Sequence, residues 1–174
     1  YGMENLINVS LKNKVKKVLT LSTDKAVNPI NLYGATKLSA DKLTIAANSL
    51  SGNLKTCFSV VRYGNIIGSR GSIIPFFQKL LDDGHKELPI TDERMTRFMI
   101  TLEQGVELVW KAFEDMVGGE IYVKKIPSMK VTDLASAIAP DCKQKIVGIR
   151  AGEKLHEQMI NIEDSASTYL YDDY

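Results

Sequence analysis

The stretch VLTLSTDKAVNPINLYGATK, residues 18–37, holds the information that decides the fold of this chain. Its first four residues form an apolar run that predicts a buried strand, and the residues from Tyr33 onward predict a helix. Open α/β sheets place their binding and catalytic groups where a strand ends and a helix begins. The sequence therefore predicts an α/β fold with functional residues after the carboxyl end of this strand.

Four side chains in this stretch can carry acid–base chemistry. Tyr33 and Lys37 are four positions apart, so on a helix they share one face. A lysine ammonium beside a phenol favours the phenolate, which makes Tyr33 a candidate general base. Asp24 and Lys25 add a carboxyl group and a second amine directly after the strand. A solvated ion pair in a loop is the alternative interpretation of Asp24 and Lys25, since such pairs are common.

The composition is typical of a soluble globular domain. The 174 residues are 44% hydrophobic and 25% charged with a net charge of +1, which gives no indication of binding to nucleic acid or to a membrane. No Cys/His cluster has the spacing of metal ligands, so we expect no metal site. The two distant cysteines, Cys57 and Cys142, favour a reducing, cytoplasmic location.

Strand and helix patterns alternate along the chain and predict a parallel sheet. Hydrophobic periodicity predicts helices at residues 2–13, 33–50, 74–81, 101–116, 132–139 and 152–160. Apolar runs predict strands or extended segments at residues 15–22, 56–62, 88–91, 120–123 and 146–149.

Two apolar stripes on these helices are expected to lie in the core. The stripe expected to face the sheet from residues 33–50 comprises Leu38, Ile45, Ala46 and Leu50. The stripe expected from residues 101–116 comprises Trp110, Phe113 and Met116.

Several motifs together resemble one enzyme family. The run from Ser22 to Lys37 contains the Tyr-x-x-x-Lys signature of the short-chain dehydrogenase/reductase superfamily. In full, it resembles the extended, NADP-dependent UDP-N-acetylglucosamine 4,6-dehydratases, of the configuration-inverting kind that opens the pseudaminic acid pathway. The resemblance continues through RYGN at 62–65, GSRGS at 68–72, MTRF at 95–98 and RAGEKLHE at 150–157. It covers nearly the whole chain.

The resemblance implies a Rossmann-like parallel sheet with a small α+β lobe for a nucleotide sugar. No Gly-x-Gly-x-x-Gly or Gly-x-x-Gly-x-x-Gly motif follows an N-terminal strand, so the chain resembles the C-terminal part of such an enzyme. We expect residues 1–72 to form the C-terminal half of an NADP-binding domain. Residues 73–174 are then mainly the nucleotide-sugar-binding lobe, with some segments returning to the sheet. On this interpretation the chain alone is inactive.

The resemblance also implies a reaction and roles for named residues. The sugar is oxidised at carbon 4, water is eliminated across carbons 5 and 6, and hydride returns to carbon 6. Tyr33 would be the base for the 4-hydroxyl, Lys25 the base for the carbon-5 proton and Asp24 the acid for the departing 6-hydroxyl. Thr23 would hydrogen-bond the 4-hydroxyl oxygen, the alternative being an ordinary strand residue.

Binding residues follow from the same resemblance. Contacts to the cofactor are expected from Tyr33, Lys37, Ser22 and Tyr63. Contacts to the substrate are expected from Asn65, Arg70, Ser72, Arg97 and Glu153. Arg70 and the helix start at Ser72 suit a phosphate, and Arg97 and Arg94 resemble pyrophosphate-binding positions. A structural ion pair is the alternative for Arg62, and ordinary surface charge is the alternative for the lobe residues.

Other functions stay open alongside the inverting dehydratase. One is another epimerase or dehydratase of the same superfamily, and the adjacent Asp24 and Lys25 weigh against it. The other is a non-catalytic fragment without a complete cofactor site, which the missing glycine loop favours. The partners implied are a UDP-sugar substrate and further copies of the chain, in a homo-oligomer formed through helices such as 2–13 and 33–50.

Overall fold

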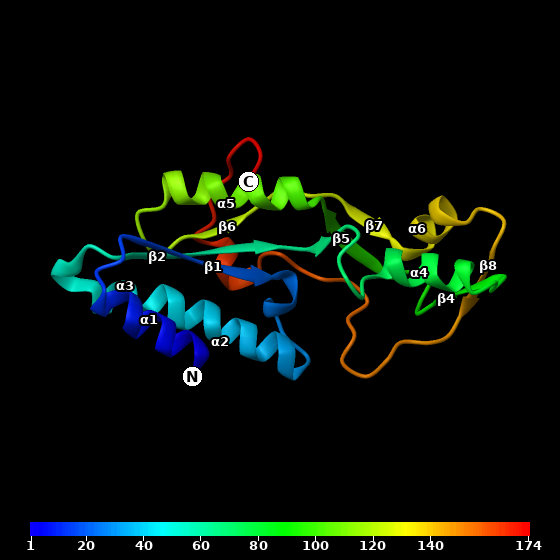
Figure 1. Cartoon of the computed structure of the whole chain (residues 1–174), viewed down its shortest axis with the longest axis horizontal. Coiled ribbons are helices and arrows are strands. Elements are labelled where there is room, and N and C mark those ends of the chain that lie inside the picture. Colours follow the sequence, from blue (N-terminus) through cyan, green and yellow to red (C-terminus); the bar gives the residue numbers. More distant parts are fainter. The chain divides into compact units, whose positions relative to one another are not determined.

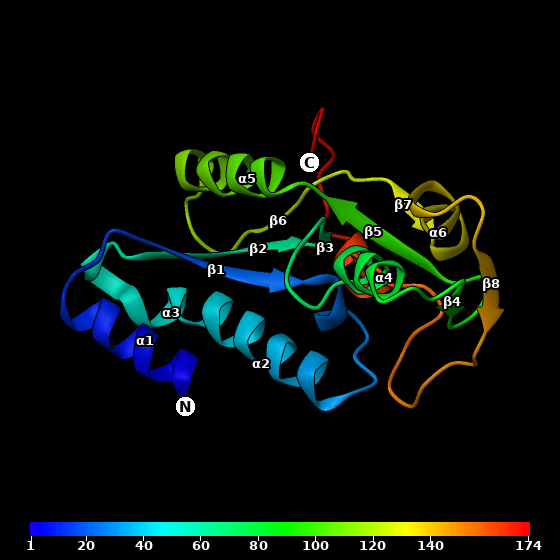
Figure 2. The same ribbon diagram turned by 45° about the vertical axis from the view of Figure 1, so that its right-hand side comes forward.

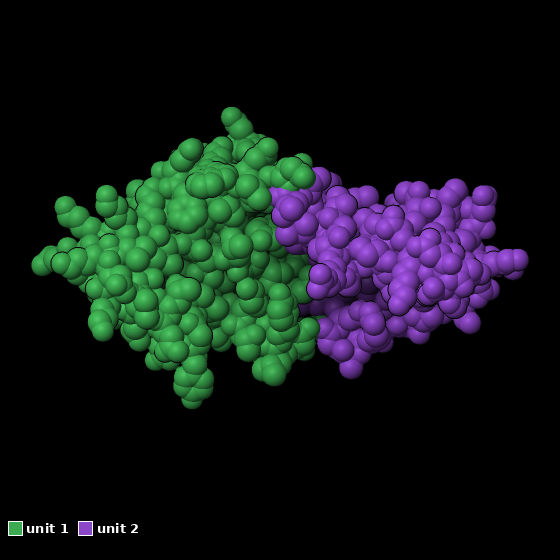
Figure 3. All heavy atoms as spheres, viewed as in Figure 1, with its two compact units in different colours: residues 1–63, 103–125, 158–174 green, residues 64–102, 126–157 purple.

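The structure, a computed structural model, describes all 174 residues, which form two compact units coloured green and purple in Figure 3. Unit 1 comprises residues 1–63, 103–125 and 158–174. Unit 2 comprises residues 64–102 and 126–157. The chain therefore leaves unit 1 twice and returns to it twice.

Unit 1 is built on a parallel sheet with the strand order β1-β2-β6. The strands are β1 (Lys17–Thr23), β2 (Cys57–Tyr63) and β6 (Ile121–Val123). In the register of β1 and β2, Ser22 lies opposite Arg62 and Thr23 lies opposite Tyr63. The carboxyl ends of these two strands therefore lie side by side.

Helices cover both faces of this sheet, as Figures 1 and 2 show. One face carries α1 (Gly2–Lys12), α2 (Leu32–Ala46) and α3 (Asn48–Ser51). The other face carries α5 (Leu102–Asp115). The core of the first face contains Ile7, Ala47 and Phe58. The core of the second contains Val61, Leu108, Ala112, Met116 and Tyr122.

Short elements complete unit 1. A 3₁₀ turn, η1 (Asp24–Ala26), follows β1, and a second, η2 (Gly52–Leu54), precedes β2. Helix α7 (Ile162–Ser165) lies in the last segment. None of the helices in the chain combines the length and the apolar character needed to cross a membrane.

Unit 2 contains two small sheets. In the first, β5 (Thr96–Ile100) pairs in parallel with β3 (Asn65–Ile66) and antiparallel with β7 (Ser128–Lys130). In the second, β4 (Glu87–Ile90) pairs in parallel with β8 (Lys143–Ile146). The helices are α4 (Ile73–Asp82) and α6 (Val131–Ile138). The core consists of Phe77, Leu88, Ile90, Met95, Val131 and Ala135.

The α/β class with a parallel sheet is confirmed, but two predicted elements were wrong. Residues 151–160 form turns and bends instead of a helix, and Gly152 has a positive φ of 81°, which interrupts helical geometry. The strand predicted at 146–149 lies at Lys143–Ile146, where it pairs with β4. Gly148, with a φ of 90°, prevents its extension to 149.

Three side chains expected in the core are exposed, which corrects the predicted stripes. Trp110 is 65% exposed because it lies on the side of α5 opposite the buried Leu108 and Ala112. Ala46 is exposed, and Leu50, which is 66% exposed, lies beyond the end of α2. Helix α2 instead buries Gly34, Asp41 and Thr44. Its contact with the sheet is therefore largely polar.

Candidate active site

The end of β1 presents a buried carboxyl group paired with a lysine. Asp24 has no exposed surface, and its Oδ1 accepts hydrogen bonds from Thr23 Oγ1 at 2.8 Å and from Lys25 Nζ at 3.0 Å. Thr23 Oγ1 in turn accepts a hydrogen bond from the backbone N–H of Lys25 at 3.4 Å, which caps η1. Asp24 Oδ2 is buried without a hydrogen-bond partner. Since buried polar atoms are almost always paired, this oxygen is a candidate contact for a ligand.

The start of α2 presents Tyr33 and Lys37. The helix begins after Asn31, whose Oδ1 accepts a hydrogen bond from the Gly34 N–H at 2.8 Å. Lys37 Nζ donates to the carbonyl oxygen of Leu21 at 2.8 Å, which ties this turn of the helix to β1. Tyr33 lies one turn earlier on the same face and is 55% exposed. Burial, and then the nearby Tyr33, raise the pKa of Tyr63.

A buried ion pair joins α2 to both strands. Asp41 Oδ2 accepts a hydrogen bond from Ser22 Oγ at 2.8 Å and lies 3.3 Å from Arg62 Nη2. Arg62 Nη1 also donates to the carbonyl oxygen of Met159 at 2.8 Å and lies 3.6 Å from Asp164 Oδ2. Burial raises the pKa of Asp41, against the opposing effects of the Ser22 hydrogen bond and the Arg62 charge.

These contacts bear on two sequence-based interpretations. Arg62 is 2% exposed and forms an ion pair with Asp41. This structural ion pair is the alternative that the sequence analysis gave for Arg62. Ser22 directs its hydroxyl to α2, so a contact from Ser22 to a cofactor stays a prediction.

In unit 2, three predicted substrate residues lie in the segment from β3 to α4. Asn65, on β3, is paired opposite Met99 and is half-buried. Arg70 is exposed in the loop that follows. Ser72 occupies the N-cap position of α4 but makes no side-chain capping bond, and its Oγ is buried without a partner. A hydroxyl in this state at a helix start can bind an anion.

Arg97 and Glu153 lie close enough in unit 2 to interact electrostatically. Arg97 Nη1 donates to the carbonyl oxygens of Thr96 at 2.7 Å and Leu155 at 3.2 Å. Glu153 Oε1 accepts from Arg150 Nη2 at 2.7 Å. This hydrogen bond lowers the pKa of Glu153, and the charge of Arg97 adds to the effect.

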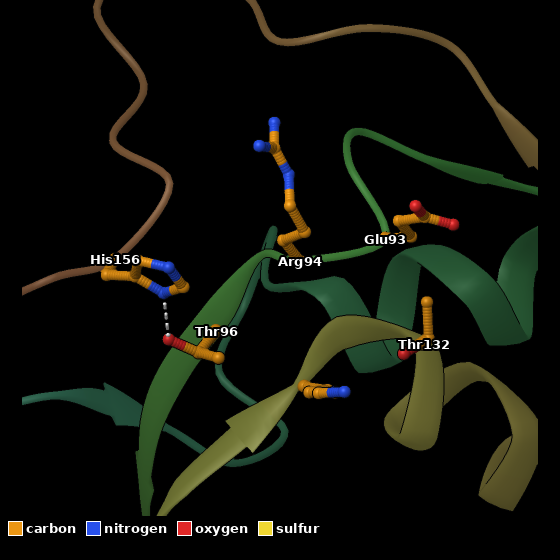
Figure 4. Close-up of a pocket in the computed structure, with 6 residues that line it drawn as sticks. Glu93, Arg94, Thr96, Thr132 and His156 are labelled. Atoms are coloured by element: carbon orange, nitrogen blue, oxygen red, sulfur yellow. Dashed lines mark hydrogen bonds between the residues drawn. The ribbon is translucent and has the colours of Figure 1, made fainter.

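Unit 2 also contains an open pocket of about 510 Å³, shown in Figure 4. Its lining residues are Glu93, Arg94, Thr96, Lys130, Thr132 and His156. His156 Nδ1 and Thr96 Oγ1 lie 2.8 Å apart in a hydrogen bond. Arg94 binds Asp92 through two side-chain bonds of 3.0 and 2.8 Å, and these bonds help to lower the pKa of Asp92 to about 2. Arg94 already has a counter-ion, so its contact with pyrophosphate stays a prediction.

The structure brings some predicted residues together and adds two that the sequence analysis missed. The carboxyl ends of β1 and β2 and the adjoining turns of the chain gather Ser22, Thr23, Asp24, Lys25, Tyr33, Lys37 and Tyr63. The missed residues are Asp41 and Arg150. The sequence offered one signal for each: Asp41 lies four residues after Lys37, and Arg150 lies three residues before Glu153, which are spacings at which opposite charges can interact. The chain has no group of three or more His, Cys, Asp or Glu side chains that could hold a metal ion.

Residues 1–174 match the family described as polysaccharide biosynthesis protein. The chain is 61% identical over 174 residues to the UDP-N-acetylglucosamine 4,6-dehydratase (inverting) of Campylobacter jejuni, covering 100% of the chain and 52% of that relative. It is 43% identical over 177 residues to the UDP-glucose 4-epimerase of Rickettsia canadensis, covering 99% of the chain and 52% of that relative. The chain thus spans about half the length of the curated relatives it matches.

Two solved structures are similar over most of the chain. The X-ray structure of Pen from Bacillus thuringiensis has a TM-score of 0.93 and 35% identity, covering 99% of this chain and 55% of that one. The crystal structure of DesIV, a dTDP-glucose 4,6-dehydratase from Streptomyces venezuelae with NAD and TYD bound, has a TM-score of 0.79 and 20% identity, covering 91% and 55%. The likeness to DesIV concerns the fold alone. These likenesses confirm a Rossmann-like parallel sheet.

Proposed function

Because the chain belongs to the polysaccharide biosynthesis protein family, we propose that the protein containing it is an NADP-dependent UDP-N-acetylglucosamine 4,6-dehydratase that inverts carbon 5. The observation that carries this proposal is the Asp24–Lys25 pair. Asp24 is fully buried, its Oδ1 is 3.0 Å from Lys25 Nζ, and its Oδ2 has no partner. The inverting dehydratase of Campylobacter jejuni, 61% identical to the chain, supports the same assignment.

The residues around the end of β1 fit a nicotinamide cofactor. Ligands of open α/β sheets bind outside the carboxyl ends of the strands, where Lys37 and Tyr33 lie. Lys37 Nζ gives one hydrogen bond to Leu21, and its two other N–H groups are suited to ribose hydroxyls. The chemistry that NADP would supply when bound is hydride transfer, from carbon 4 of the sugar and later back to carbon 6. We propose Tyr33, Lys37, Ser22 and Tyr63 as the residues of this chain that contact the cofactor.

Tyr33 is the proposed base for the 4-hydroxyl. It is half exposed at the start of α2, so a sugar hydroxyl can reach its phenol oxygen. Lys37, one helical turn later on the same face of α2, would hold the cofactor ribose beside this phenol. Thr23 would hydrogen-bond the same sugar oxygen from the end of β1.

Lys25 and Asp24 are the proposed base and acid for the elimination. Lys25 must be a neutral amine to take the carbon-5 proton, and Asp24 must be a carboxylic acid to protonate the departing 6-hydroxyl. Moving one proton across the 3.0 Å contact from Lys25 Nζ to Asp24 Oδ1 would produce both forms at once. The net charge of the pair stays zero, so the buried site need not bind or release a proton to become ready.

Unit 2 is the proposed binding lobe for the nucleotide sugar. Arg97 and Arg70 offer guanidinium groups suited to phosphate oxygens. Glu153, held by Arg150, is suited to the ribose hydroxyls of uridine. Ser72 Oγ, buried without a partner, and Asn65 complete the proposed contacts.

We also propose a pathway, a cellular location and an oligomeric assembly for this protein. The product would be the first committed intermediate toward pseudaminic acid, made in the cytoplasm by a homo-oligomer. Exposed apolar residues on α1 and α2 support a self-association surface there, namely Leu6, Val9 and Leu43. Such residues are commonly buried between subunits.

A nucleotide-sugar 4-epimerase is the second candidate, favoured by 43% identity to the Rickettsia canadensis enzyme. An epimerase needs the carbon-4 base but no base at carbon 5. Under this alternative, Asp24 and Lys25 would be a structural ion pair only.

The test uses the full-length protein and UDP-N-acetylglucosamine in deuterated water, followed by proton NMR. We expect a 4-keto-6-deoxy sugar of inverted configuration with deuterium at carbon 5. A 4-keto-6-deoxy sugar with retained configuration would keep the dehydratase but contradict the role of Lys25. A 4-epimerised sugar with no deuterium at carbon 5 would establish the second candidate instead.

A further inference from the structure

Gly34, the single glycine of α2, lies where this helix meets the turn that carries Asp24 and Lys25. Gly34 is buried, whereas Tyr33 beside it is exposed. An added Cβ at Gly34 would lie 2.8 Å from Pro29 Cβ and 3.3 Å from the carbonyl carbon of Lys25, and closer still to the Lys25 oxygen. Non-bonded carbon atoms normally stay about 3.5–4.0 Å apart. The first turn of α2 therefore rests directly on the backbone of η1.

The backbone conformation does not require a glycine at this position. Gly34 is absent from the residues of positive φ, and glycine is a poor helix former compared with alanine. Gly105, a buried glycine of α5, shows the contrast because an added Cβ there would have no atom within 4 Å apart from its chain neighbours and the backbone of its own helix. What Gly34 provides is space for the Lys25 carbonyl.

This close contact connects the two groups of proposed catalytic residues. Tyr33 directly precedes Gly34 in the chain, and Lys25, whose carbonyl meets Gly34, is ion-paired with Asp24. The hydrogen bond from the Gly34 N–H to Asn31 Oδ1 holds the helix start in place. We propose that Gly34 is a positioning residue, whose missing side chain sets the distance from the Tyr33 phenol to the Asp24–Lys25 pair. The inference rests on the proposed function, in which these groups act on adjacent carbons of one sugar.

A methyl group at Gly34 would force this spacing to change. To restore a normal contact with Pro29 and Lys25, the helix start must shift by about 1 Å relative to η1. A misplacement of this size costs roughly 100-fold in the rate of a positioned reaction. Binding of the nucleotide should be unaffected. The residues proposed to bind it, Arg97 and Glu153, are remote from Gly34 in the sequence, and neither is among the atoms that an added Cβ at Gly34 would meet.

The test compares Gly34→Ala with Gly105→Ala in the full-length protein, using UDP-N-acetylglucosamine and its carbon-4-deuterated form. For Gly34→Ala we expect kcat to fall roughly 100-fold with KM unchanged. The isotope effect of carbon-4 deuterium on kcat should grow, because displacing Tyr33 slows the oxidation step. Gly105→Ala should match the wild type in kcat, KM and isotope effect.

Asn31→Ala decides the question if Gly34→Ala does not fold. It removes the hydrogen bond to the Gly34 N–H without adding a methyl group, so the helix start is loosened but not blocked. We expect folded protein with kcat lowered by roughly 3- to 10-fold, unchanged KM and the same growth of the isotope effect.

The proposal is overturned if folded Gly34→Ala keeps kcat within about threefold of the wild type. It is equally overturned if Gly34→Ala is unfolded and Asn31→Ala loses stability but no kcat. Failure of the proposed function is seen separately, in the wild type. A wild type that binds this sugar nucleotide but never dehydrates it would overturn the dehydratase assignment and this inference together.

Discussion

Replacing Arg62 with methionine would remove the positive charge from a buried ion pair while keeping most of the side-chain volume. Arg62 is 2% exposed and Asp41 is 1% exposed, so water cannot solvate the carboxylate that remains. Asp41 would keep only its hydrogen bond from Ser22 Oγ. Removing one partner of such a pair costs about 3–5 kcal/mol, because the other charge stays buried and uncompensated.

The assay is urea unfolding of the full-length protein at pH 7, followed by circular dichroism. A loss of about 4 kcal/mol with a slope of about 2 kcal/mol per molar urea moves the midpoint down by about 2 M. Asp41→Asn should cost less, about 1–3 kcal/mol, since Arg62 keeps Asp164 and the Met159 carbonyl. The double variant Arg62→Met with Asp41→Leu should recover most of the loss, because no buried charge remains.

The pH dependence separates this explanation from a packing defect. Burial raises the pKa of Asp41 in the folded protein, and Arg62 opposes that rise. Without Arg62 the folded protein holds the proton on the Asp41 carboxyl more tightly than the unfolded chain does, since aspartates in an unfolded chain titrate near about 3.9. Stability of Arg62→Met relative to wild type should therefore fall as pH rises from about 4 to 7. A loss below about 1 kcal/mol at pH 7, or an equal loss at both pH values, would refute the reasoning.

Three other outcomes are expected from the full-length protein. Lys25→Arg keeps a cation beside Asp24 but cannot supply a neutral amine. The kcat of this variant should therefore fall roughly 10²- to 10⁴-fold with little change in melting temperature. Inverted product formed at the wild-type rate would contradict the role of Lys25. Glu120→Gln should lower stability at pH 7: burial opposes ionisation of Glu120, but hydrogen bonds from Ser59 and backbone N–H groups outweigh it and lower its pKa. The difference from wild type in urea unfolding should then persist above about pH 4.3 and disappear as pH falls through the folded-state pKa. Leu108→Ala should lower the free energy of unfolding by about 2–5 kcal/mol. Trp110→Ser, on the exposed side of the same helix, should change it by less than about 1 kcal/mol. Equal effects would contradict the assignment of the Leu108 side of α5 to the core.

The strand β1 and the helix α2 could be predicted from the sequence because their signals are local. A continuous apolar run and the helix pattern from Tyr33 onward suffice, and the motif from Ser22 to Lys37 joins them. The inner face of α2 could not be predicted in the same way. Hydrophobic periodicity selects leucine and isoleucine, whereas the residues that α2 buries include Asp41 and Thr44. Their partners, Ser22, Arg62 and Thr20, are distant in the sequence, so only the fold reveals the pairing.

The second half of the chain was harder to predict for a related reason. The segment 152–160 has the composition of a helix, but its contacts with strand β5 decide its structure. The Leu155 carbonyl accepts hydrogen bonds from the Thr96 N–H and from Arg97, and Thr96 also binds His156. Positive φ values at Gly148 and Gly152 shape the same region. Long-range bonds of this kind leave no periodic pattern in the sequence.

The return of the chain to unit 1 has a consequence for synthesis on the ribosome. Arg62 donates a hydrogen bond to a carbonyl oxygen 97 residues later in the chain, at Met159. At about 5–20 residues per second, roughly 5–20 s pass between the translation of these two residues. During that interval the guanidinium of Arg62 has Asp41 but neither Met159 nor Asp164 to bind. A nascent chain that ends before Met159 therefore lacks two of the partners of this guanidinium, and we expect chaperones to bind it during that interval.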